Sequence, residues 1–156
     1  MTRGSDSAET DWRERFEALV ERQCALYGAL DALSQRQTEL VEAGDAEGVL
    51  AVLRSRQEVL DELSAVAERQ RPLRDRWASS LALIEMPVRE RIAARVHAME
   101  RLAAEINERD ERDRERLEEQ RDSIANELAS VGKTRRAVSA YGESPSYGAR
   151  FQDREG

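Results

Sequence analysis

The sequence predicts an all-α protein: an elongated antiparallel three-helix bundle or coiled coil with a flexible C-terminal tail. Charged residues make up 37% of the 156 residues and aromatic residues only 4%. A composition dominated by Ala, Glu, Arg and Leu favours long helices over a sandwich, barrel or doubly wound sheet. The Ala43-Gly44-Asp45 segment is typical of a tight connection between two helices. Before it, a leucine recurs every seventh residue, at Leu19, Leu26, Leu33 and Leu40.

The first helix is expected over about residues 9–43, after a small, polar and disordered segment 1–8. Phe16 and Leu30 extend the leucine repeat into an apolar seam along one side of this helix. Gln23 and Gln37 fall on the same seam. Two interpretations are open for them: they lie at its edge in water, or they are buried amides that fix the register of the helices.

The second helix is expected over residues 45–83, with Gly44 closing the first helix and Asp45 as N-cap. Pro72 should kink this helix because it removes a backbone donor. Trp77 is expected to cap the open end of the bundle, and an exposed anchor for a partner is the alternative. The expected core side chains are those with helical spacing: Leu50, Leu53, Leu60, Leu63 and Ala67.

The third helix is expected over residues 87–138, with Pro87 in its first turn. It begins with an amphipathic pattern that includes Ile92, Val96 and Met99. Residues 107–116 then lack any apolar side chain, and we interpret them as a solvated helical face with ion pairs four residues apart. Further apolar positions follow at Leu117, Ile124, Leu128 and Val131.

Residues 139–156 are expected to form a flexible tail, because Gly, Pro and Ser are frequent there. The tail nevertheless carries Tyr141, Tyr147 and Phe151. Two interpretations are open: the aromatic residues belong to a docking peptide, or they are incidental in a solvated tail.

Several functional classes find no support in the residues. The net charge of −7 argues against nucleic acid and anionic lipid as ligands. No apolar run reaches the ~20 residues that a membrane-spanning helix needs, and the N-terminus does not resemble a signal peptide, so a cytoplasmic location is expected. Cys24 and His97 are the only residues of their types, and no glycine-rich phosphate loop is present. We therefore expect no enzyme activity, no cofactor and no metal.

Four segments resemble the FlgN-type flagellar export chaperones. Glu39 to Leu50, ELVEAGDAEGVL, is similar to the phrase that joins the first two helices of that family, and 54–63 is similar to the leucine-rich stretch that follows. Asn107 matches the first residue of an N-x-x-N pair, whereas Asp110 replaces the second. Tyr141-Gly142 matches a tyrosine and glycine after the last helix. The resemblance covers roughly residues 16–142.

The resemblance implies a cytosolic chaperone that keeps hook-associated proteins, which form the hook–filament junction, soluble and delivers them to the flagellar export gate. It further implies that the end of the third helix and the tail contact the client. A structural coiled-coil homodimer or adaptor without an export role is the alternative, and a DNA-binding protein is disfavoured by the charge. The expected partner-binding residues are Ile124, Leu128, Val131, Val138, Tyr141, Tyr147 and Phe151.

Overall fold

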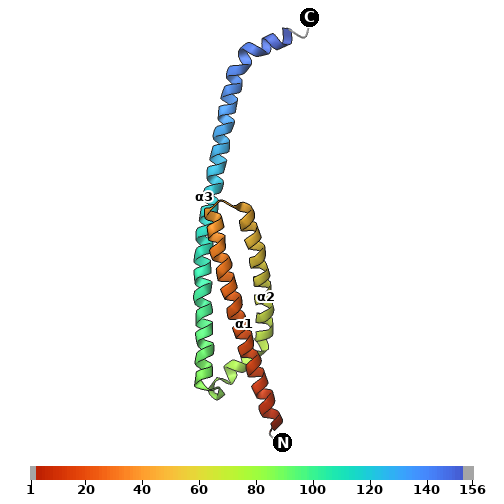
Figure 1. Ribbon diagram of the computed structural model, residues 1–156, viewed down its shortest axis with the longest axis vertical. Coiled ribbons are helices and arrows are strands. Elements are labelled where there is room, and N and C mark those ends of the chain that lie inside the picture. The colour runs from red at the N-terminus through yellow and green to blue at the C-terminus, as the bar shows by residue number, and fades with distance from the viewer. Residues whose placement is uncertain (1–2, 153–156) are drawn as a thin grey trace. The chain divides into compact units, whose positions relative to one another are not determined.

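The computed structural model describes the backbone of residues 3–152 and the side chains of residue 4 and residues 6–140. Its elements are α1 (Arg3–Glu42), α2 (Ala46–Ser79), a short 3-10 helix η1 (Leu81–Leu83) and α3 (Met86–Gln152) (Figure 1). No strand occurs in the described part of the chain, so the predicted all-α class is confirmed. The chain divides into two compact units, Met1–Arg114 and Glu115–Gly156, and the helical bundle is the first of them.

The helix bounds differ from the expected ones at three places. The first helix begins at Arg3 rather than near residue 9, and α3 continues to Gln152 rather than ending near 138. The second helix passes through Pro72 and ends at Ser79, after which η1 begins at Leu81. Both larger shifts occur in segments without apolar periodicity, so no packing pattern in the sequence marks where these helices begin or end. The kink expected at Pro72 and the flexibility expected for residues 139–156 stay predictions.

The connection between α1 and α2 follows the sequence signals closely. Gly44 has a φ of +69°, a left-handed conformation that glycine adopts without a steric penalty. The backbone N–H of Asp45 donates to the carbonyl of Leu40 and that of Gly44 donates to Val41, the pattern of a Schellman motif. The Asp45 carboxylate then accepts a 2.9 Å hydrogen bond from the backbone N–H of Gly48. The predicted helix end and N-cap are therefore confirmed.

The helices α1 and α2 are antiparallel and keep one register along the bundle. The rings of Phe16 and Trp77 stack with centroids 4.9 Å apart. Gln23, seven residues after Phe16, accepts a hydrogen bond from Gln70, which is seven residues before Trp77. Trp77 is buried, which favours the capping interpretation over an exposed anchor.

The same register returns two heptads later in a buried layer of polar residues. Gln37 accepts a 2.7 Å hydrogen bond from Arg56 and donates one of 3.1 Å to Asp113 of α3. Asp113 also accepts from the hydroxyl of Thr38, and Asp110 forms two hydrogen bonds of 2.7 Å with Arg56. The hydrogen bonds that Arg56 donates to the Asp110 carboxylate raise the pKa of Arg56. These contacts favour the interpretation of the seam glutamines as residues that fix the register.

The interpretation of residues 107–116 as a solvated face is wrong for one side of the helix. Asp113 is 3% exposed, and Arg109 pairs with Asp31 of α1 across 2.8 Å. The hydrophilic run therefore has an inward face of paired charges and an outward face in water. A pattern of apolar residues cannot reveal such a face, because the buried contacts here are polar.

The predicted leucine seam is confirmed on α1. On α2 it is wrong for Leu50, Leu53 and Leu60, whereas Leu63 and Ala67 are half-buried. On α1, Phe16, Leu26, Leu30 and Leu40 are buried. On α2 the buried apolar residues are Val49, Val52, Val66 and Trp77, whereas Leu50, Leu53 and Leu60 are between 41% and 55% exposed. Val49 and Val52 are three residues apart, as are Leu50 and Leu53 one position further along α2. Periodicity alone therefore could not decide which of them faces α1.

Candidate partner-binding surfaces

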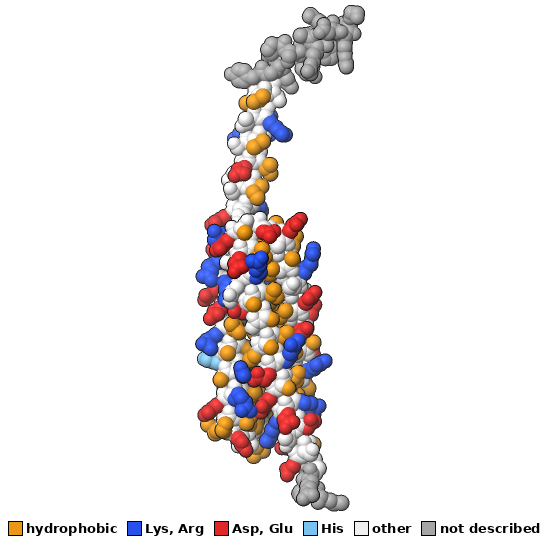
Figure 2. Space-filling model, in the orientation of Figure 1, with side chains coloured by type: hydrophobic (Ala, Val, Ile, Leu, Met, Phe, Trp, Pro, Cys, Tyr) orange, Lys and Arg blue, Asp and Glu red, His pale blue; other side chains and the backbone are white. Residues whose placement is uncertain are grey.

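The second unit carries an apolar stripe on one side of α3. Its side chains lie within an arc of about 80° when projected down a helix of 3.6 residues per turn. Each is at least 40% exposed, and Figure 2 shows hydrophobic groups at the surface along this part of the chain. We call this surface the α3 stripe; it consists of Leu117, Ile124, Leu128, Val131 and Val138.

Within residues 115–140, the part of the second unit whose side chains are described, nothing covers the α3 stripe. No side chain in the described range 115–140 is buried. Helix formation here rests on good helix formers such as Glu, Arg, Leu and Ala, and on local contacts such as the hydrogen bond from Thr134 to the carbonyl of Ser130. Such a helix is marginal in water, because most helical stability comes from packing an apolar face. A partner that covers the stripe would supply that packing.

The structure tests the placement of only some of the residues expected to bind a partner. Ile124, Leu128, Val131 and Val138 share one exposed face, the arrangement that an incoming amphipathic helix requires. The side chains of Tyr141, Tyr147 and Phe151 lie outside the described residues. The contact role of all seven residues stays a prediction.

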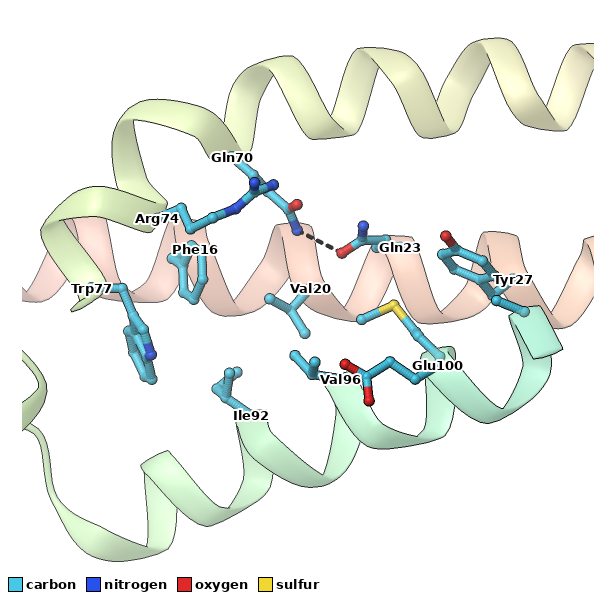
Figure 3. Close-up of a pocket in the computed structure, with 12 residues that line it drawn as sticks. Phe16, Val20, Gln23, Tyr27, Gln70, Arg74, Trp77, Ile92, Val96 and Glu100 are labelled. Atoms are coloured by element: carbon cyan, nitrogen blue, oxygen red, sulfur yellow. Dashed lines mark hydrogen bonds between the residues drawn. The ribbon is translucent and has the colours of Figure 1, made fainter.

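A second surface, the α2–α3 groove, opens between these helices with α1 as its floor (Figure 3). It has a volume of about 420 Å³. Trp77 and Ile92 line one end, and the hydrogen-bonded pair of Gln23 and Gln70 lies at the middle. Val96 also lines this groove and remains 40% exposed.

Sequence reasoning missed the α2–α3 groove, although it named several of the lining residues as core positions. Ile92, Val96 and Met99 were expected on one apolar face of the third helix. The structure buries Ile92 and Met99 but leaves Val96 at the edge of the groove. The separation between two helices depends on tertiary packing, and no local sequence signal encodes it.

Groups capable of chemistry are few in the described part of the chain. The thiol of Cys24 donates a weak hydrogen bond to the carbonyl of Arg95, and burial raises its pKa. His97 lies 3.6 Å from Glu100 with 80% of its side chain exposed. Within the described residues, no group of three or more His, Cys, Asp and Glu side chains could hold a metal ion. None of the helices described there is both long and apolar enough to cross a bilayer.

Comparison with known proteins identifies the family. The family model described as FlgN protein matches residues 12–147. This range covers all of α2, most of α1 and α3, and most of the second unit. No curated protein and no solved structure matches the chain. Because the match extends over most of the sequence, the chain belongs to the FlgN family of flagellar export chaperones.

Proposed function

We propose that the chain is a cytoplasmic chaperone that binds hook-associated proteins of the flagellum and delivers them to the export apparatus. The observation that carries the proposal is the exposed α3 stripe in a chain that belongs to the FlgN family. A chaperone of this type needs no cofactor, because occupying an assembly surface of the client is enough to prevent premature assembly.

The client contact is an amphipathic helix that packs on the α3 stripe. Ile124, Leu128 and Val131 are spaced by four and three residues, which suits anchors at the same spacing on the client. Burying each such side chain contributes about 1.5–3 kcal/mol, offset by the cost of association and ordering. The proposal includes Tyr141, Tyr147 and Phe151 of the C-terminal segment as further client contacts.

The distinguishing experiment compares Leu128→Asp with Asn126→Asp. Both variants add one negative charge to the same turn of α3, but Asn126 lies about 160° away from Leu128 around the helix. Titration calorimetry with a purified hook-associated protein should show at least tenfold weaker binding for Leu128→Asp and an unchanged affinity for Asn126→Asp. Equal affinities of wild type and Leu128→Asp would refute the assigned contact.

A homodimeric coiled coil or adaptor remains the second candidate, because Leu117, Ile124, Val131 and Val138 also follow a strict heptad repeat. Analytical ultracentrifugation separates the two functions. A monomer that gains helicity when mixed with a hook-associated protein supports the chaperone. A tight dimer that is indifferent to the client, and that Leu128→Asp dissociates, supports the structural protein.

A further inference from the structure

The first unit carries a separate apolar groove between α1 and α2, with none of its lining residues contributed by α3. Its volume is about 650 Å³. Ala18 and Leu19 of α1 and Pro72 and Leu73 of α2 form an apolar floor. Leu19 and Leu73 are only half-buried and Ala18 and Pro72 are exposed, so the floor is accessible to a partner.

Three arginines and no carboxylate complete the lining: Arg15 and Arg22 on α1 and Arg69 on α2. We call this surface the basic groove. Its charge is a local feature that opposes the net charge of −7 of the whole chain. An apolar floor with a cationic rim is complementary to an apolar face with anionic flanks.

The rim arginines are available to an external carboxylate. Arg15 lies 3.3 Å from Asp11, and both side chains are more than 60% exposed. Arg22 pairs with Glu62, and both of these side chains are 55% exposed. Exposed pairs contribute about 0–1 kcal/mol, so a partner can replace them at little cost. In the described part of the chain, no ion pair holds Arg69.

We propose that the basic groove binds an acidic amphipathic helix of another protein. Arg15 and Arg22 are seven residues apart, which separates them by about 10.5 Å along α1 at 1.5 Å per residue. Two carboxylates seven residues apart on one flank of the incoming helix reach these two arginines, and a carboxylate on the other flank reaches Arg69. Leucine-type side chains between the flanks pack on Leu19 and Leu73. The surface belongs to the first unit, and the proposal does not depend on the client role of the α3 stripe.

Two synthetic peptide helices with the same leucine face test the proposal, one flanked by Glu and one by Lys. The net charge of the chain alone favours the Lys peptide. The basic groove instead predicts at least tenfold tighter binding of the Glu peptide to the full-length chain, measured by fluorescence anisotropy at 0.15 M salt, where long-range fields are screened beyond about 8 Å. Equal binding of the two peptides, or a preference for the Lys peptide, would overturn the proposal.

Charge-reversal variants locate the site. Arg15→Glu/Arg69→Glu should weaken Glu-peptide binding at least tenfold, whereas Arg54→Glu/Arg101→Glu, with the same change in net charge on exposed positions outside the groove, should change it less than twofold. Equal losses in the two variants would indicate a non-specific charge effect and would overturn the proposal.

Three further measurements test the site and its occupant. Ala18→Trp fills the floor without altering charge, and it should abolish peptide binding while helical content is retained. The client-surface variant Leu128→Asp should leave peptide binding unchanged, and a loss there would place the peptide on the α3 stripe instead. Vesicles of phosphatidylglycerol test a lipid ligand: binding to these vesicles without discrimination between the peptides would overturn the protein-partner proposal.

Discussion

Arg56 of α2 and Asp110 of α3 form two hydrogen bonds of 2.7 Å each, the bidentate geometry in which a guanidinium matches a carboxylate. The Arg56 side chain is only 12% exposed. Gln37 of α1 contributes a third acceptor for the same guanidinium. The pair therefore joins all three helices at the polar layer, next to the buried carboxylate of Asp113.

Replacing Arg56 by Met should destabilise the bundle by about 3 kcal/mol, because the carboxylates of Asp110 and Asp113 would lose their compensating charge in a largely buried site. Urea unfolding followed by circular dichroism measures the change. Arg54→Met is the matched control: Arg54 is exposed, and a change within about 0.5 kcal/mol is expected there. Equal losses at the two positions would contradict the assigned role of the pair.

Adjacent residues on α2 test which side of the helix faces the core. Val52→Ala removes buried methyl groups and should cost about 2 kcal/mol, including the cavity that remains. Leu53→Ala removes more carbon but from a side chain that is 45% exposed, and it should cost less than about 1 kcal/mol. Urea midpoints of the two variants decide between the valine and leucine seams. A larger loss of stability for Leu53→Ala than for Val52→Ala would indicate that the leucines, not the valines, face the core.

Two glycines in helices should respond oppositely to replacement by alanine. Gly28→Ala meets no atom within 4 Å and should stabilise the bundle by about 0.5–1 kcal/mol. At Gly48, an added Cβ would lie 2.6 Å from the Asp45 carboxylate and 2.7 Å from Leu40. Gly48→Ala should therefore disturb the N-cap. Its free energy of unfolding should be at least about 1 kcal/mol lower than that of Gly28→Ala. Thermal unfolding of the two variants gives the comparison, and equal gains would argue against the tight cap.

The hydrogen-bonded amides of Gln23 and Gln70 should contribute more to specificity than to stability. Gln23→Leu/Gln70→Leu replaces both partners with apolar groups, so the free energy of unfolding should stay equal or rise by about 1 kcal/mol. Loss of this amide pair should also permit other registers and association states. Sedimentation velocity should show a broader or larger species than the wild-type chain. A strongly destabilised double variant with an unaltered sedimentation profile would contradict this role.

The thiol of Cys24 should titrate at higher pH in the folded chain than in the unfolded one. Burial is the main cause of its raised pKa, with Glu21 acting in the same direction and Arg95 opposing. Because folding raises this pKa, the associated stability is fully present below the unfolded pKa of about 8.5 and declines as pH rises through the folded pKa. The rate of iodoacetamide alkylation between pH 7 and 10 measures the pKa of Cys24 in the folded chain, in buffer, and in the unfolded chain, in urea. Faster alkylation of the folded thiol at pH 8 would be inconsistent with the burial.

The local signals in this sequence were strong enough to define the helices and one connection. The leucine repeat of α1 and the Gly44–Asp45 motif depend only on residues within two turns of each other. The helix and the turn can therefore be predicted without knowledge of the rest of the fold. The exposed stripe from Leu117 to Val138 was also readable, because apolar residues that recur on one side of a hydrophilic helix are visible in the sequence itself.

Only the tertiary structure decides between residues that fit the helical spacing equally well. Val52 and Leu53 belong to series of equal spacing, and only packing against α1 selects the valines. In the sequence, Asp110 and Asp113 cannot be told from surface charges. In the folded bundle Arg56 donates to Asp110 and Gln37 donates to Asp113, from two other helices. The basic groove likewise combines Arg22 with Arg69 from separate helices. The sequence by itself determined the all-α class, the α1–α2 turn and the α3 stripe. The inward faces of the helices, the polar layer and the grooves depend on the register between helices, because their contacts join residues far apart in the chain.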